Sequence, residues 1–139
     1  MNEETSYVLC VIIEDNKILL QHRLSEPNAG KWNSPGGKVK PWETFEEACV
    51  REVYEETSLK IMHPKHVSTI IYKQLGSVAR IAVFTVRTFS GKPVSSSEGE
   101  VRWVRIEHLT NLKHNLAANL DWFVELALQS ELPPLELVY

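Results

Sequence analysis

The sequence predicts a single α/β domain, and three observations support this fold class. Two runs of strand-forming residues, 7–13 and 17–22, flank a turn at 14–16. Two further runs, 67–75 and 79–89, alternate well between apolar and polar residues and meet at a second turn. Helical spacing of apolar residues follows Thr44 and returns within 109–129, and between these helices the chain after Leu59 is expected to form a loop through Pro64. The buried stripe expected on the second helix consists of Leu116, Leu120, Phe123, Val124 and Ala127. A chain of 139 residues, 43% of them hydrophobic, is enough for one domain over 1–139 with a substantial core.

The first predicted helix begins with a clear capping signal. Thr44 is suited to accept the first free backbone N–H groups, and Glu47 three residues later completes a capping box. The residues that follow at helical spacing on one apolar face are Phe45, Ala48, Cys49 and Val53. We therefore expect this helix to pack against the sheet through that face.

The other face of the same helix carries three carboxylates. Glu52, Glu55 and Glu56 stand at i, i+3 and i+4, where like charges repel by a few tenths of a kcal/mol per pair. Three convergent carboxylates suit a hard divalent cation such as magnesium, which prefers oxygen ligands. A solvated acidic face is the alternative, and it is the commoner meaning of such spacing. The nearby glycine-led loop, 36–43, and Arg51 favour the metal site.

The whole stretch resembles the signature of the Nudix hydrolase family. That signature is Gly, five residues, Glu, seven residues, Arg-Glu, an aliphatic, any residue, Glu-Glu, any residue, Gly, an aliphatic. The matching positions here are Gly37, Glu43, Arg51, Glu52, Val53, Glu55, Glu56 and Leu59. Ser58 stands where the family has glycine. That position is expected to end the helix at positive φ, where a residue other than glycine costs about 1 kcal/mol unless the helix ends in another way.

The resemblance implies a fold, a reaction and a metal. The fold would be an α/β/α sandwich, with a mixed sheet between the signature helix and a C-terminal helix. The reaction would be hydrolysis of a nucleoside diphosphate linked to another group, with magnesium, or manganese in its place, as cofactor. The implied metal ligands are the Gly36 carbonyl, Glu52, Glu55, Glu56 and a loop acid, for which Glu98 is the better match and Glu100 the reserve. The alternative for both Glu98 and Glu100 is an ordinary charged side chain on a surface loop.

Further roles follow from the same resemblance. Arg51 and Glu43 would pair and orient the carboxylates. Glu52 and Glu98 both remain candidates for the group that takes a proton from the attacking water. The catalytic set is therefore Glu43, Arg51, Glu52, Glu56 and Glu98.

The wording Trp-Asn-x-x-Gly-Gly-Lys-Val resembles the oxidised-purine nucleotide hydrolases within that family, where the asparagine faces the base. The substrate-binding candidates are Arg23, Asn33, Gly37, Lys38 and Asn119. A strand-end arginine and a lysine can contact phosphate, but both also occur as solvated charges. The asparagines have structural alternatives as well: one as a turn residue, the other as an exposed helical side chain. The expected substrate is a purine nucleoside triphosphate such as 8-oxo-dGTP, with ADP-ribose or a dinucleoside polyphosphate as the alternative.

Composition and charge limit the classes of partner and the location that we expect for this protein. A formal net charge of -3 without a long basic run argues against binding to a nucleic-acid polymer, although it allows a nucleotide. No signal peptide or membrane-spanning run is visible, so we expect a cytoplasmic monomer or homodimer. Cys10 and Cys49 lie in apolar patterns and are expected to be buried thiols. A binding module without catalysis, or a structural protein with an acidic surface helix, remains an alternative.

Overall fold

β1 (Glu3–Glu14) is the central strand of a mixed sheet in the computed structural model, which describes residues 3–24, 29–74, 76–117, 120–129 and 135–138. The strand order is β10-β6-β7-β1-β2-β3, with β4 also paired to β1 and β9 to β2. β1 runs parallel to β7 and antiparallel to β2 and β4. The bounds are β2 (Lys17–Arg23), β3 (Trp32–Asn33), β4 (Gly36–Lys38), β6 (Lys65–Gln74), β7 (Ser77–Val86), β9 (Gly99–Arg105) and β10 (Leu135–Val138).

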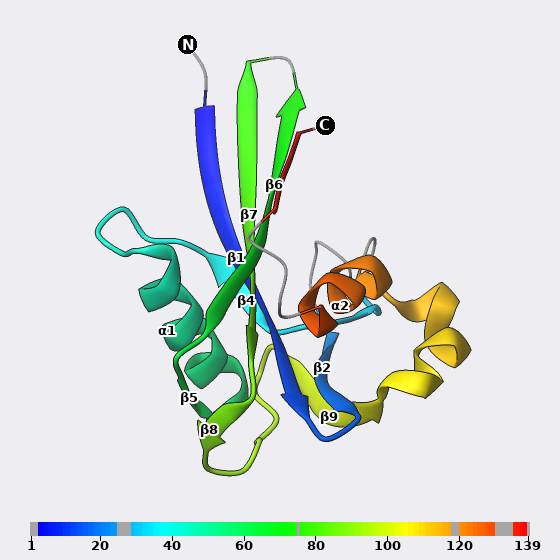
Figure 1. The fold of residues 1–139 in the computed structure, drawn as a ribbon. Coiled ribbons are helices and arrows are strands. Elements are labelled where there is room, and N and C mark those ends of the chain that lie inside the picture. Colours follow the sequence, from blue (N-terminus) through cyan, green and yellow to red (C-terminus); the bar gives the residue numbers. More distant parts are fainter. Residues whose placement is uncertain (1–2, 25–28, 75, 118–119, 130–134, 139) are drawn as a thin grey trace.

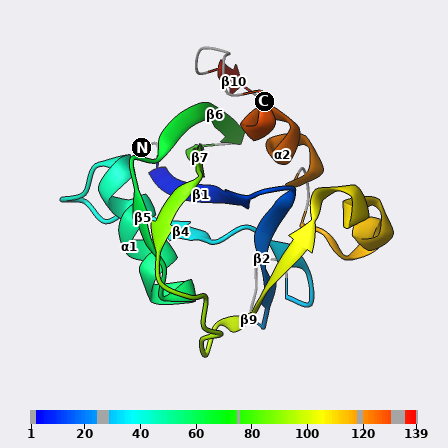
Figure 2. The same ribbon diagram turned by 60° about the horizontal axis from the view of Figure 1, so that its bottom comes forward.

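Helices cover both faces of this sheet, as Figures 1 and 2 show. α1 (Phe45–Thr57) lies on one side, and α2 (Leu120–Leu128) lies on the other, preceded by the 3-10 helix η1 (Ile106–Asn115). A two-stranded sheet of β5 (Lys60–Met62) and β8 (Thr88–Ser90) extends the α1 side. The predicted sandwich of a mixed sheet between two helices is confirmed.

The side chains of β1 alternate between two hydrophobic cores, as a strand with both faces covered requires. Its odd-numbered core residues pack with α2, and its even-numbered ones pack with α1. The α2 side receives Leu9, Val11 and Ile13, and the α1 side receives Val8, Cys10 and Ile12. One strand therefore fixes the distance between the two helical layers.

The signals at the two ends of α1 act as the sequence predicts. Thr44 Oγ1 accepts from the Glu47 N–H at 3.1 Å, and the Glu47 carboxylate accepts from the Thr44 N–H at 2.9 Å, which completes the capping box. Ser58 ends the helix in the left-handed region, with φ 67°, and its N–H donates to the Tyr54 carbonyl. The family's glycine position thus keeps its conformation without a glycine.

Three local expectations are wrong. The stretch after Leu59 was expected to be a loop through Pro64, but β5 forms there because Ile61 is buried between two exposed residues and β8 supplies its hydrogen-bonding partner. Leu116 was placed on the buried stripe of the second helix, yet it lies before α2 and forms a bridge to Trp32. β7 ends at Val86, and Phe89 belongs to β8.

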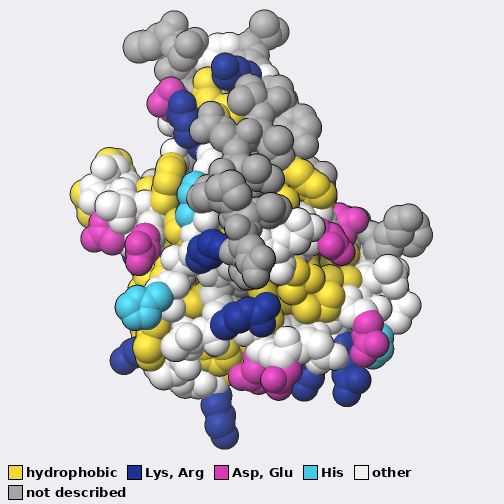
Figure 3. Space-filling view, in the orientation of Figure 1, with side chains coloured by type: hydrophobic (Ala, Val, Ile, Leu, Met, Phe, Trp, Pro, Cys, Tyr) yellow, Lys and Arg dark blue, Asp and Glu magenta, His cyan; other side chains and the backbone are white. Residues whose placement is uncertain are grey.

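The surface carries mixed charge. Figure 3 shows acidic and basic side chains interspersed among apolar ones on the face seen in Figure 1. Within the described part of the chain, no helix is long and apolar enough to cross a lipid bilayer.

Candidate active site

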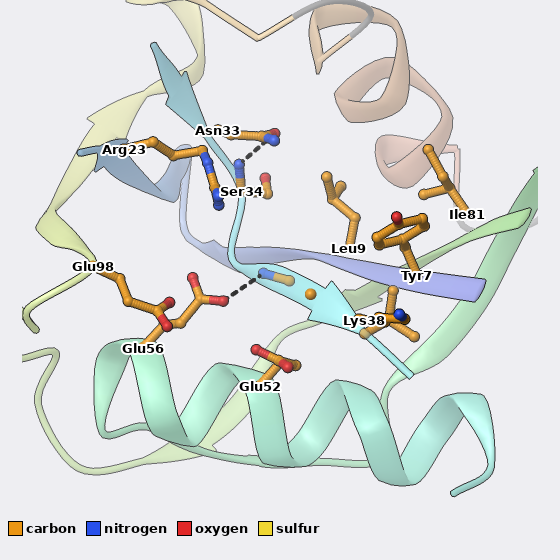
Figure 4. A pocket seen from close by; sticks show the side chains of 13 residues that line it. Tyr7, Leu9, Arg23, Asn33, Ser34, Lys38, Glu52, Glu56, Ile81 and Glu98 are labelled. Atoms are coloured by element: carbon orange, nitrogen blue, oxygen red, sulfur yellow. Dashed lines mark hydrogen bonds between the residues drawn. The ribbon is translucent and has the colours of Figure 1, made fainter. Parts of the chain in front are cut away.

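A cavity of about 480 Å³ lies beside β1 and β4, above the polar face of α1 (Figure 4). Its volume is in the range of small-molecule sites. Acidic side chains from α1 and the loop before β9 line its lower part in Figure 4, while polar and apolar side chains from β1, β2, β3 and β7 line the rest. The lining residues are Tyr7, Val8, Leu9, Arg23, Asn33, Ser34, Gly36, Gly37, Lys38, Glu52, Glu56, Ile81 and Glu98.

The glycine pair in β4 brings the backbone close to both β1 and α1. A Cβ on Gly36 would collide with the carbonyl oxygen of Val8 in the neighbouring strand. A Cβ on Gly37 would lie 2.5 Å from the Glu52 carboxylate. The two glycines therefore let β4 pair with β1 and leave room for a carboxylate directly beneath the strand.

Arg51 joins the glycine loop to the acidic face of α1. Its guanidinium donates to both carboxylate oxygens of Glu43, at 2.6 and 2.8 Å, and to the Lys38 carbonyl at 3.1 Å. The same group donates to Glu52 at 2.7 Å and to Glu55 at 3.2 Å. The fork of Arg51 lowers the pKa of Glu43 to about 2 and raises its own pKa. The predicted pairing of Arg51 and Glu43 is present, and it holds the loop and the Glu52 side chain in place.

Glu56 is a buried carboxyl group with a strongly altered protonation equilibrium. Its side chain is 1% exposed, and its Oε1 accepts from the Gly36 N–H at 3.4 Å. Burial, followed by the nearby charges of Glu98 and Glu52, raises the pKa of Glu56 to about 9. Its Oε2 is buried without a hydrogen-bond partner among the described residues. A buried oxygen of this kind is costly unless a ligand, a water or a cation contacts it.

These donors fit a divalent cation. Glu52, Glu56 and Glu98 all line the same cavity and are near enough to one another to shift the Glu56 pKa upward. No three acidic, histidine or cysteine side chains already converge as a complete cage within the described ranges. Magnesium does not need such a cage, because it is commonly held by one or two carboxylates together with water and substrate phosphates.

Of the predicted metal ligands and their reserve, Glu98 lines the cavity, whereas Glu55 and Glu100 do not. Glu98 faces the cavity, whereas Glu100 forms an exposed ion pair with Arg102 at 3.2 Å. Glu55 is 52% exposed, pairs with Arg51 and does not line the cavity. Its predicted role as a metal ligand stays a prediction.

The predicted substrate residues Arg23, Asn33, Gly37 and Lys38 all line the cavity. Asn33 Oδ1 accepts from the Ser34 N–H at 2.9 Å, as a turn-forming asparagine does. Since a backbone N–H can only donate, the acceptor must be the amide oxygen, and the amino group remains as a donor. Asn119 lies outside the described residues.

Several lining residues were missed at the level of sequence. Ser34 is 4% exposed, and its hydroxyl has no hydrogen-bond partner in the described part of the chain. Tyr7 and Leu9 come from β1. Ile81 comes from β7, and its sequence pattern alone favours packing in the core over lining a cavity. Alternation along β1 places Tyr7 and Leu9 on one face of the strand. This face lines a cavity because β1 pairs with β4, and the local sequence of β1 carries no signal for that pairing.

Comparison with known proteins gives consistent results. The family model described as NUDIX domain matches residues 4–125. The chain is 35% identical over 109 residues to an uncharacterized Nudix hydrolase, YvcI, of Bacillus subtilis, a match that covers 74% of this chain and 67% of the relative. It is 28% identical over 117 residues to an oxidized purine nucleoside triphosphate hydrolase of Danio rerio, covering 83% of this chain and 74% of that protein.

A solved structure shares the fold. The crystal structure of a MutT NUDIX hydrolase from Burkholderia pseudomallei superposes with a TM-score of 0.77 at 25% sequence identity. The match covers 89% of this chain and 98% of that chain.

Proposed function

The chain belongs to the NUDIX family and is a hydrolase of nucleotide substrates, and from this premise we propose that it cleaves a purine nucleoside triphosphate to the monophosphate and pyrophosphate with magnesium. The observation that supports this proposal best is the cavity itself. It joins a buried Glu56 oxygen, which has no hydrogen-bond partner among the described residues, at one end to the amide of Asn33 at the other.

The acidic end would hold the metal. We assign its protein ligands to Glu52, Glu56, Glu98 and the Gly36 carbonyl, with Glu55 entering only if Arg51 releases it. When bound, magnesium neutralises the phosphates and makes a bound water more acidic. Manganese offers a similar ligand preference and would act as a substitute. Arg51 would orient Glu52 and anchor the loop through Glu43, as supporting hydrogen bonds do at metal sites.

Glu98 is our candidate for the group that accepts the water's proton. Arg51 already donates a 2.7 Å hydrogen bond to the Glu52 carboxylate and so occupies one of its oxygens. Glu56 holds a proton at neutral pH in the metal-free protein, since its pKa is about 9. Glu98 lies at the same end of the cavity, and in the described part of the chain its carboxylate has no ion pair.

The opposite end would bind the base. With its oxygen used by the Ser34 N–H, the Asn33 amide offers N–H donors to a ligand. Donors suit a purine that presents carbonyl oxygens as acceptors, and a guanine oxidised at C8 carries a second carbonyl besides the one at C6. The Ser34 hydroxyl adds another polar group, while Tyr7, Leu9 and Ile81 offer apolar surface for the ring. Arg23 and Lys38 lie at the cavity wall, where they would contact phosphate.

A pyrophosphate-release assay with magnesium tests the substrate. The panel holds 8-oxo-dGTP, dGTP, dATP, CTP, ADP-ribose and a dinucleoside polyphosphate. We expect 8-oxo-dGTP to give the highest kcat/KM and Asn33→Ala to reduce that preference by about 10-fold or more, because a lost base contact costs about 1–3 kcal/mol. Highest activity on ADP-ribose, or equal loss on every substrate in the variant, would contradict the assignment.

Glu98→Gln and Glu100→Gln form a matched pair for the proton acceptor. Both remove one acid at the start of β9, Glu98 just before the strand and Glu100 within it, but only Glu98 faces the cavity. We expect Glu98→Gln to lower kcat by at least about 100-fold with little change in KM, because the attacking water loses the group that accepts its proton, and Glu100→Gln to leave both constants unchanged. A near-normal kcat in Glu98→Gln would transfer the role to Glu52.

A further inference from the structure

A second cleft, separate from the catalytic cavity, lies between β9 and η1. Its volume is about 390 Å³, and it shares no lining residue with the cavity beside α1. η1 lies on the opposite side of the sheet from α1 (Figures 1 and 2). The two-residue strand β3 separates the sites, because Trp32 lines the second cleft while Asn33 lines the first.

The polar lining of this cleft is basic. Lys17 from β2, Arg102 and Arg105 from β9, and His108 from η1 contribute to it, and none of its described lining residues is acidic. Two strands thus place three cations around one hollow, in a chain whose formal net charge is -3. The alternative is a basic strand that simply faces solvent. That alternative does not account for His108, which η1 adds to the same cleft.

One of these cations is held in position by stacking. The Arg102 guanidinium lies 5.9 Å from the ring centroid of Trp32, and the His22 ring stacks on Trp32 at 4.8 Å. A guanidinium stacked on an aromatic ring keeps its N–H fork free to meet phosphate oxygens. Trp32 is half-buried in the core beneath it, so the platform is rigid.

The acids that pair with Arg102 and Arg105 leave these arginines accessible to a ligand. Glu100 contacts Arg102 at 3.2 Å and Glu107 contacts Arg105 at 3.5 Å, and all four side chains are about half exposed or more. Exposed ion pairs of this kind contribute little, so a phosphate with two or more charges can displace them. Lys17 has no acidic partner within the described residues.

We propose that this cleft binds a phosphate-bearing small molecule at a site distinct from the catalytic cavity. Arg102, which lies over Trp32, contacts the phosphate groups. Lys17 and Arg105, opposite each other in the β2–β9 pairing, add positive charge at the end of the strands, and Trp32 and Leu112 provide the apolar floor. The bounded hollow and the negative net charge favour a small ligand over a nucleic-acid strand.

Calorimetric titration of the metal-free protein with inorganic pyrophosphate tests the proposal. Without metal, the carboxylates of the catalytic cavity repel phosphate, so binding there is suppressed. The test variant is Arg102→Ala with Arg105→Ala, and the control is Lys73→Ala with Arg87→Ala, which removes the same charge from exposed residues outside both sites. We expect wild type and control to bind one pyrophosphate and the test variant to bind at least 10-fold more weakly.

No binding to wild type, or equal weakening in both double variants, would overturn the proposal. A parallel titration with ADP shows whether the ligand is a nucleotide or pyrophosphate alone, and tighter binding of a single-stranded oligonucleotide than of either would overturn the small-ligand assignment. Amide and indole chemical shifts of the wild-type protein provide a check that needs no variant. Pyrophosphate should shift the Trp32 indole signal, and shifts confined to Gly37 and Lys38 would contradict the site. These measurements need no turnover, so their failure is distinct from failure of the proposed activity.

Discussion

α1 and α2 cover opposite faces of one sheet, yet they contribute very different side chains to the interior. The described buried residues of α2 are all apolar: Leu120, Phe123, Val124 and Ala127. α1 buries Ala48, Cys49 and Val53 in the same manner but also buries the carboxyl group of Glu56. α1 also has a capping box and an arginine that binds three glutamates. The buried face of α2 therefore serves packing, whereas that of α1 also includes an ionisable group to which the proposed mechanism gives a role.

The largest test of this comparison is Glu56→Gln. The variant keeps the shape of the side chain but removes the proposed metal ligand, so we expect kcat to fall by at least about 100-fold, above the range for supporting residues at metal sites. Steady-state pyrophosphate release with magnesium measures the loss. Glu46→Gln on the exposed first turn of α1 serves as the matched control and should leave kcat unchanged. Near-normal turnover by Glu56→Gln would remove Glu56 from the site.

The second test is the pH dependence of stability without metal. The pKa of Glu56 is about 9 in the folded protein and near 4.5 when unfolded. Between these values the folded state holds a proton that the unfolded state has lost, so this contribution to the free energy of unfolding falls as pH rises. The expected slope is on the order of 1 kcal/mol per pH unit between pH 6 and 8.

Urea unfolding in a chelator at several pH values provides the measurement. Glu56→Gln should remove this part of the slope and should be the more stable protein at pH 8. Parallel curves for the variant and the wild type would mean that the carboxyl group is ionised in the folded state.

For α2 the expected effects are reversed. Val124→Ala removes two buried methyl groups and should lower the free energy of unfolding by about 2 kcal/mol. The kcat and KM of the folded enzyme should remain those of the wild type, because no residue of α2 lines the cavity. Urea unfolding and initial rates below the thermal midpoint check both statements. A selective change in KM would show that α2 takes part in binding substrate.

The same contrast explains what the sequence could predict. α1 was predictable in detail because its cap, its apolar face and its carboxylates are encoded at short, fixed spacings. The longer strands β1, β2, β6 and β7 were also found, since strand-forming residues run together along them and turn residues separate them. The wall formed by Tyr7, Leu9 and Ile81 was missed, because it arises from the pairing of β1 with β4 and β7, segments far apart in the chain. Three-residue β5 was missed because its pattern is shorter than one reliable period.

The smallest expected effect concerns the C-terminal end of α1. Ser58→Gly should raise the free energy of unfolding by about 1 kcal/mol, because glycine adopts the observed φ of 67° without steric cost. Thermal unfolding measures the gain, and Ser58→Ala, which keeps the Cβ, should show none. If both variants were equally stable, left-handed strain would not be the relevant property of this position. Activity should not change, since Ser58 does not line the cavity.

β10 covers part of the edge of the main sheet that β6 would otherwise expose. It pairs in parallel with β6 from Ser68 to Ile71, so those backbone groups of the sheet margin are already hydrogen-bonded within the chain. An uncovered strand of this length is a template on which a neighbouring molecule can add a strand. The four-residue strand β10 offers a far shorter template in its place. Its pairing therefore shields the middle of the β6 edge from strand addition, and a fusion partner placed there would require a linker long enough to leave the pairing intact.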